Sequence, residues 1–231
     1  MVNNEWVASA SMNLARAIAA AAQLQDGRLL VTGGNSPDLK SAEISSGVGW
    51  DTNIPFLPIT VYGHCMVTVN STTVIVIGGA QNGQVSGKTF YFTLGAISWT
   101  EGPRLKINRF YFSCGIIRSN KVGQEMSIIV AGGWNGSYAF SFVEILGIGS
   151  NVWQTGPELP FGIWGAQMVE DKNGGVVLTG GRSSSGINLD TLYQLPYGGQ
   201  DAVWTKMDQK MKKARYMHTA IMVPDSIVDC Y

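Results

Sequence analysis

Four short runs of apolar residues each end in a pair of glycines, and they recur at nearly regular spacing. The runs are LLVTGG, VIVIGG, IIVAGG and VVLTGG, which end at Gly34, Gly79, Gly133 and Gly181. The intervals between them are 45, 54 and 48 residues. A short apolar, β-branched run predicts a buried strand, and a period near 50 residues predicts a repeat protein.

Tryptophan follows the same period. A tryptophan recurs between successive glycine pairs, at Trp50, Trp99 and Trp153, while Trp6 precedes the first pair and Trp204 follows the last. Two copies share a longer motif, WTEGP at 99–103 and WQTGP at 153–157, in which Gly-Pro marks the turn that ends a strand. The repeating unit therefore contains more than the glycine pair.

A further segment accompanies each unit. Five stretches align without gaps: RAIAAAAQL (16–24), VYGHCMVTV (61–69), RFYFSCGII (109–117), FGIWGAQMV (161–169) and RYMHTAIMV (215–223). The alanines of the first stretch favour a helix when it is taken alone. The other four stretches are rich in β-branched, aromatic and glycine residues, which favours a strand. We therefore predict an inner strand in all five copies.

Each unit then has four antiparallel strands: the inner strand, the strand that ends in Gly-Gly, a third strand and a fourth that carries the tryptophan. The predicted third strands are 41–44, 88–94, 140–146 and 189–195. Four strands in about 50 residues is the pattern of a β-propeller blade. The order of these elements resembles the kelch repeat over nearly the whole chain. The tyrosine that is usual in the third strand of a kelch repeat is clearly present only in the last copy, as Tyr193.

The resemblance implies an all-β fold, a single kelch propeller domain over residues 1–231. We expect four whole blades and a partial or composite fifth, which would join Trp6 to RYMHTAIMV and SIVDCY at the other end. The alternative is that the chain is part of a longer propeller. The glycine pairs are expected to leave the sheet with positive φ. The tryptophans are expected to fill the wedges between blades.

Composition narrows the possible partners. Lys and Arg total 16, Asp and Glu total 16, and charged residues make up 14% of the chain, so nucleic acid and membrane surfaces are disfavoured. No signal peptide or membrane-length apolar stretch is visible, and the three cysteines are scattered, so we expect a cytoplasmic location. Cys65 and Cys114 are offset by one residue in the alignment. We expect them to face opposite sides of their strands and to remain unbridged.

Candidate chemistry is sparse. His64 and His218 share one position of the inner strand, but a catalytic metal site needs at least three ligands and the chain has no third histidine. We therefore expect hydrogen-bonded structural histidines, with no metal and no cofactor. Motifs for a nucleophile elbow, a phosphate loop or a zinc protease are absent, so we predict no catalytic residues. The alternative is a propeller enzyme similar to galactose oxidase or to the sialidases.

Three arginines, Arg16, Arg109 and Arg215, begin inner strands. Kelch propellers that bind acidic peptides carry arginines at the comparable position, so the resemblance implies a partial basic collar around a central pocket. The alternative pairs each arginine with backbone carbonyls or a neighbouring acid. The basic run 206–215 is predicted to be a solvated loop between blades.

The loops after the glycine pairs should share one face, and they offer further candidate binding residues: Trp134, Asn135, Tyr138 and Arg182, with Gln81 and Asn82 in another loop. We predict a protein–protein interaction module that binds a protein or an acidic peptide through this face. The resemblance implies a scaffold or a ubiquitin-ligase substrate adaptor as its role.

Overall fold

A computed structural model of the chain describes residues 8–35, 40–118, 126–196 and 202–223. Over these residues the protein is all-β, and no helix is present. Accordingly, no helix in the described part could cross a membrane. Trp6 and the SIVDCY segment, on which the composite fifth blade depends, lie outside the described residues.

Four antiparallel sheets of four strands form the blades, and the predicted strand order is confirmed in each. The first blade contains β1 (Ala20–Gln23), β2 (Leu29–Thr32), β3 (Ala42–Ser45) and β4 (Trp50–Asp51). The second contains β5 (Cys65–Thr68), β6 (Thr73–Ile77), β9 (Thr89–Thr93) and β10 (Thr100–Glu101). The third contains β11 (Ser113–Arg118), β12 (Met126–Ala131), β13 (Val143–Gly147) and β14 (Gln154–Thr155). The fourth contains β16 (Gln167–Glu170), β17 (Val176–Thr179), β19 (Thr191–Leu195) and β20 (Thr205–Lys210).

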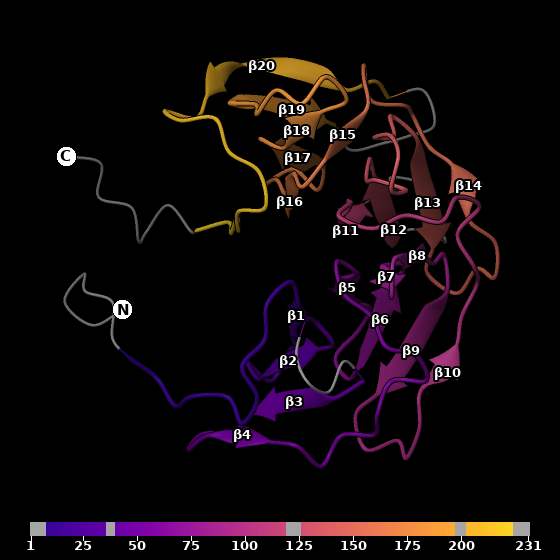
Figure 1. The fold of residues 1–231 in the computed structure, drawn as a ribbon, viewed down its shortest axis with the longest axis vertical. Coiled ribbons are helices and arrows are strands. Elements are labelled where there is room, and N and C mark those ends of the chain that lie inside the picture. The colour runs from indigo at the N-terminus through magenta and orange to yellow at the C-terminus, as the bar shows by residue number, and fades with distance from the viewer. Residues whose placement is uncertain (1–7, 36–39, 119–125, 197–201, 224–231) are drawn as a thin grey trace.

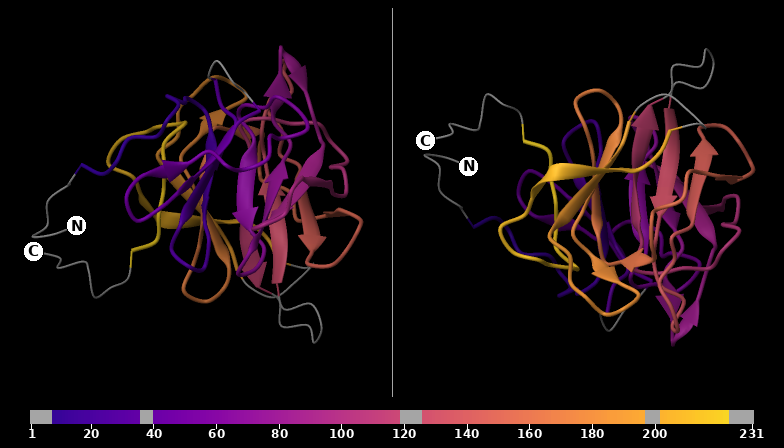
Figure 2. Two further views of the ribbon diagram at one scale, coloured as in Figure 1. Left: turned by 90° about the horizontal axis from the view of Figure 1, so that it is seen from below. Right: turned by 90° about the horizontal axis from the view of Figure 1, so that it is seen from above.

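The blades are arranged around a common centre as in a β-propeller (Figure 1). The inner strands β1, β5, β11 and β16 lie closest to the centre, and β4, β10, β14 and β20 lie at the outside. The side views show the sheets one beside the next (Figure 2). The arc is open on the side where the segment before β1 and the segment after β20 lie.

The opening alanine run is a strand, as predicted. β1 pairs antiparallel with β2 from Ala20↔Thr32 to Gln23↔Leu29. Ala20 is buried, and β1 also lies against β5 of the next blade. Alanine prefers a helix by only a small free energy. This preference is outweighed because the alanines complete the β1–β2 hydrogen-bond ladder and their small side chains fit a narrow inner position.

Apolar side chains fill the three gaps between successive blades, and each gap contains one tryptophan: Trp99, Trp153 or Trp204. Each indole Nε1–H donates a hydrogen bond to a proline carbonyl in the linker that enters the same blade. The acceptors are Pro55, Pro103 and Pro157, at 2.8, 2.8 and 2.9 Å. The predicted wedge role of these tryptophans is confirmed, and the polar edge of each ring is satisfied as well.

The glycine pairs join one blade to the next. The first glycine of each pair has a φ between 57° and 69°, which a side chain disfavours. The second donates its N–H to the carbonyl of the first residue of the following inner strand, for example Gly34 to Val61 and Gly79 to Arg109, both at 2.9 Å. A Cβ at Gly78 would lie 2.9 Å from that Arg109 oxygen. The glycines are therefore required by close backbone approach as well as by φ.

The same hydrogen bond corrects the alignment of the fourth copy. Gly133 donates to the carbonyl of Ile163 at 2.7 Å, whereas the predicted alignment placed Phe161 at this position. The prediction was wrong by two residues, so Ala166, not Trp164, is the counterpart of His64. The loop predicted over the basic run 206–215 is also partly wrong, because residues 205–210 form the outer strand β20.

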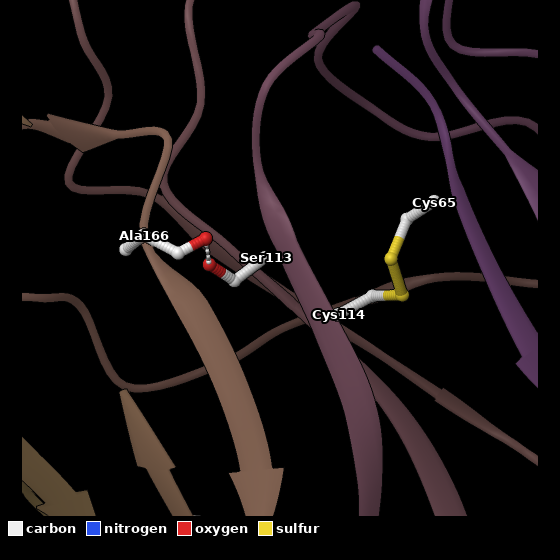
Figure 3. The surroundings of a disulfide bond; sticks show 4 residues. All are labelled: Cys65, Ser113, Cys114 and Ala166. Atoms are coloured by element: carbon white, nitrogen blue, oxygen red, sulfur yellow. Dashed lines mark hydrogen bonds between the residues drawn. A yellow bond between two sulfur atoms is a disulfide. The ribbon is translucent and has the colours of Figure 1, made fainter. Parts of the chain in front are cut away.

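Cys65 and Cys114 form a disulfide bond, with Cα atoms 6.2 Å apart, so the expectation that they remain unbridged was wrong. Residues on opposite faces of equivalent strands point toward each other when neighbouring blades pack face to face. Both cysteines belong to the gap between the second and third blades. Figure 3 shows the adjacent Ser113 pointing to the other side, where its hydroxyl donates to the carbonyl of Ala166 at 2.8 Å.

Candidate binding surface

The backbone at the centre of the molecule sets the geometry of the candidate site. The third residue of each aligned inner segment has a left-handed conformation, with φ between 52° and 64°; these residues are Ile18, Gly63, Tyr111, Gly165 and Met217. From Gly63 onward, each N–H donates to the carbonyl of the preceding residue in this series, at 3.1, 2.8, 2.7 and 2.7 Å. This chain of hydrogen bonds holds the inner strands at fixed spacing around the axis.

The second residue of each inner segment lies beside the residue that follows the glycine pair of the same blade. The four antiparallel pairs are Ala17↔Asn35, Tyr62↔Ala80, Phe110↔Trp134 and Trp164↔Arg182. The last of these belongs to the small sheet of β15 (Ile163–Trp164) and β18 (Arg182–Ser183). A second small sheet, β7 (Ala80–Gln81) and β8 (Gln84–Val85), carries Gln81, and Asn82 lies in its turn. The start of each inner strand therefore meets the loop after the glycine pair, at equivalent places in all four blades.

Aromatic side chains from these positions form a continuous group, which we call the axial aromatic surface. It contains Tyr62, Phe110, Tyr111, Trp134, Trp164 and Tyr216, all partly exposed. Neighbouring ring centroids in this group are between 4.4 and 6.2 Å apart. Such separations are typical of favourable aromatic pairs. The rings thus support one another while leaving part of their area open.

Arg182 adds a positive charge to this surface. Its guanidinium carbon lies 5.4 Å from the centroid of the Tyr216 ring, and its Nε donates to the carbonyl of Gly186 at 3.1 Å. Among the described residues no carboxylate lies within ion-pair distance of it. The cation–π contact orients the guanidinium and leaves its charge available.

The tyrosines of the surface are hydrogen-bonding groups. Burial raises the pKa of the Tyr111 hydroxyl, and neighbouring Tyr62 raises it further. Tyr111 therefore remains protonated at neutral pH and can donate a hydrogen bond. Flat aromatic faces, a phenol and a guanidinium together suit a ligand with apolar or aromatic groups and a carboxylate.

Arg16 and Arg109 lie inside the protein, and both side chains are fully buried. Arg109 donates to Glu144 at 2.8 Å and to the carbonyls of Gly132 and Phe142, each at 2.8 Å. Arg16 makes the equivalent contacts in the first blade, with Glu43 at 2.9 Å. The structure thus places both arginines in the arrangement that the alternative described, and it does not bring them to the binding surface.

Hydrogen bonds surround the glutamate of each pair. Burial raises the pKa of Glu43, but hydrogen bonds from the backbone of Asn13, the side chain of Arg16 and other donors more than offset this, so the pKa is lowered. Glu144 accepts the corresponding backbone hydrogen bonds, from Lys106 at 2.7 Å and Ile107 at 3.3 Å. Each pair therefore fastens the linker, the glycine turn and the third strand of its blade together.

The remaining predicted residues lie near the surface in different ways. Trp134 is part of the axial aromatic surface. The side-chain oxygen of Asn135 accepts hydrogen bonds from the backbone of Ser137 and Tyr138 at 2.9 and 3.0 Å, which shapes the loop. Tyr138 is 56% exposed, and its ring contacts Phe140 rather than the aromatic group. Arg215 is exposed.

The two histidines lie in different interfaces. His64 Nε2 is 2.9 Å from the hydroxyl of Thr32, and His218 Nε2 is 2.9 Å from that of Thr179. The prediction of hydrogen-bonded histidines is confirmed. Burial lowers the pKa of His64 to about 3, so the ring is neutral at physiological pH. In the described ranges, no three His, Cys, Asp or Glu side chains are grouped to hold a metal ion.

Five rings of this surface were not among the binding residues predicted from the sequence: Tyr62, Phe110, Tyr111, Trp164 and Tyr216. A signal was present, since the second position of the inner segment is aromatic in four of the five copies once the fourth is aligned from Ile163. The two-residue error removed Trp164 from that column and hid the pattern.

Comparison with protein-family models and with curated proteins gives no match for this chain. The sheet arrangement alone shows a β-propeller with four blades among the described residues.

Proposed function

We propose that this protein is a non-enzymatic, kelch-type propeller that binds a protein or peptide through the axial aromatic surface. The single observation that carries the proposal is the convergence of six partly exposed rings and Arg182 at the centre of one rim. Propellers commonly serve as interaction scaffolds, although fold alone does not define function. Aromatic residues and arginine are the types most enriched at binding hot spots.

The chemistry of the surface favours an extended peptide with aromatic or apolar side chains and at least one carboxylate. Rings would receive the apolar groups, and Arg182 would bind the carboxylate through paired N–H donors. A role as a scaffold is consistent with such binding. A sialidase-like site would need several free arginines, whereas Arg16 and Arg109 are engaged in buried ion pairs.

The Cys65–Cys114 disulfide bears on the location of the protein. Disulfides persist in oxidising compartments and are rare in the cytosol. It therefore supports an oxidising compartment over the cytoplasmic location expected from the sequence, and this inference is part of the proposal.

The test is selection of a random dodecapeptide phage library on the purified protein, followed by affinity measurements with synthetic versions of the enriched peptides. We expect enriched sequences that combine acidic and aromatic residues. Trp134→Ala and Arg182→Ala should each weaken their binding about tenfold or more. Ile97→Ala is the matched control, because Ile97 is 95% exposed and lies in the β9–β10 turn.

Failure to enrich any peptide would contradict the proposal. Equal affinities for the wild type and both surface variants would contradict it too, because binding would then occur elsewhere.

A further inference from the structure

The segment after β20 lies against the fourth blade as the first strand of a further blade would. The carbonyl of Arg215 accepts from Gly181 at 2.8 Å, and Met217 donates to Gly165 at 2.7 Å. His218 reaches Thr179 of the fourth blade as His64 reaches Thr32 of the first. Residues 215–218 therefore reproduce the contacts of the second inner strand, although the segment has no strand partner among the described residues.

The outer edge of this segment has no strand partner among the residues that the structure describes. In the first blade, residues 20–23 pair with β2, and their counterparts by position are residues 219–222, which we call the docking edge. Within the described ranges, the docking edge makes no backbone hydrogen bond. Two of its side chains, Ile221 and Met222, are 72% and 57% exposed. Residues 219–222 are not a β-strand in the structure, but a segment at the inner-strand position with exposed apolar groups can pair with an added strand.

Arg215 lies beside the docking edge at the position of Arg16 and Arg109. It retains one local contact of that position, from its Nε to the carbonyl of Lys213 at 3.3 Å. At Arg16 and Arg109, the other guanidinium N–H groups donate to a glutamate on the third strand and to two backbone carbonyls. No described carboxylate lies within ion-pair distance of Arg215, and the side chain is exposed.

The backbone beside Arg215 is also prepared for a carboxylate. In the first blade, Glu43 accepts the N–H groups of Asn13 and Leu14, which lie three and two residues before the arginine. The residues at the same offsets from Arg215 are Lys212 and Lys213. Their N–H groups have no acceptor in the described part of the chain, and their side chains add positive charge.

We propose that residues 215–223 form a docking site for a β-hairpin of a partner protein. The first strand of the hairpin would pair antiparallel with residues 219–222. Its second strand would carry a glutamate that binds Arg215 and the N–H groups of Lys212 and Lys213. The docking edge and Arg215 lie outside the axial aromatic surface, although Tyr216 of the same segment belongs to that surface. The site recognises both strand pairing and the glutamate, since a bound hairpin without the acidic residue would leave the guanidinium of Arg215 unpaired.

The probe for this site is a synthetic peptide with the sequence of residues 29–45, which contains both strands of such a hairpin and Glu43. Its binding to the full chain would be measured by calorimetry. We expect 1:1 binding that weakens about tenfold or more with Glu43→Gln in the peptide or with Arg215→Ala in the protein. The two changes together should cause no further loss. Arg104→Ala, which alters an exposed arginine in a linker, should leave binding unchanged.

Hydrogen exchange provides the second measurement. The amides of residues 219–222 should exchange rapidly in the free protein and become protected when the peptide binds. Slow exchange in the free protein would overturn the proposal, because the edge would already be occupied by the same chain or by a second copy. Peptide binding that is insensitive to both charge changes would overturn it as well.

Discussion

His64 lies between the first and second blades, where water does not reach its ring. The side chain is 7% exposed, and Thr32 is its single hydrogen-bonding partner among the described residues. A charged imidazole in this apolar gap would lose its hydration without gaining a counter-ion. Burial therefore lowers the pKa of His64 to about 3, from an ordinary value of 6.5. The fold holds this histidine neutral.

This shift predicts how stability depends on pH. Between the two pKa values the unfolded chain binds a proton that the folded protein excludes. The contribution of this pKa difference to the free energy of unfolding is therefore fully present above pH 6.5. It is lost as the pH falls toward 3, by up to about 1.4 kcal/mol per pH unit. Urea unfolding of the wild type and of His64→Gln at several pH values measures it. We expect a shallower slope in the variant, and equal slopes would contradict the assignment.

At the scale of the element, the Arg–Glu pair is a repeated unit that ties one blade together. Arg109 and Glu144 come from the inner and third strands, and the pair also fixes the linker through Lys106 and the glycine turn through Gly132. Arg16 and Glu43 repeat it in the first blade. A buried ion pair adds little over an apolar pair, but loss of one partner leaves a charge uncompensated.

We predict that Glu144→Gln lowers the free energy of unfolding by about 3 kcal/mol or more. The double variant Arg109→Met with Glu144→Leu should regain part of this loss. Glu170→Gln is the control, because the Arg118–Glu170 pair is of similar length, 2.7 Å, but exposed, and its loss should cost under about 1 kcal/mol. Chemical denaturation measures all three. Equal costs for Glu144→Gln and Glu170→Gln would contradict the argument.

The elements were predictable where the information repeats along the sequence. The strand order, the glycine turns and the wedge tryptophans all follow from residue types that return with each unit. The partner of Arg109 was not predictable in this way, because Glu144 lies on a different strand and a glutamate is absent from that position in the second and fourth blades, where Phe90 and Tyr193 stand. Arg109 therefore resembled a surface residue in the sequence.

At the scale of the whole molecule, the disulfide joins the second and third blades directly. To predict this bond, one must know how neighbouring blades face each other, which the pattern within one blade does not show. Rotation about the axis turns opposite faces of equivalent strands toward each other. Cys65 and Cys114 are 49 residues apart, so the bond closes a long loop in the unfolded chain. Such a bond stabilises mainly by restricting the unfolded ensemble.

We predict that the double variant Cys65→Ser with Cys114→Ser unfolds with a free energy lower by about 2–4 kcal/mol. Reduction of the wild type by dithiothreitol should have a similar effect, and reduction of the double variant should have none. Chemical denaturation, with thiol labelling followed by intact mass to count the bonded cysteines, provides the measurement. Labelling of both Cys65 and Cys114 in unreduced, denatured protein would show that the bond is absent.

The chain of N–H···O=C bonds from Ile18 to Met217 has a consequence for the number of repeats. Every link is alike, made by one left-handed residue to the next, and nothing in it distinguishes a first copy from a last. Duplication or deletion of one whole unit would therefore leave the remaining central hydrogen bonds intact, so the number of repeats can change during evolution without other changes at the centre of the molecule.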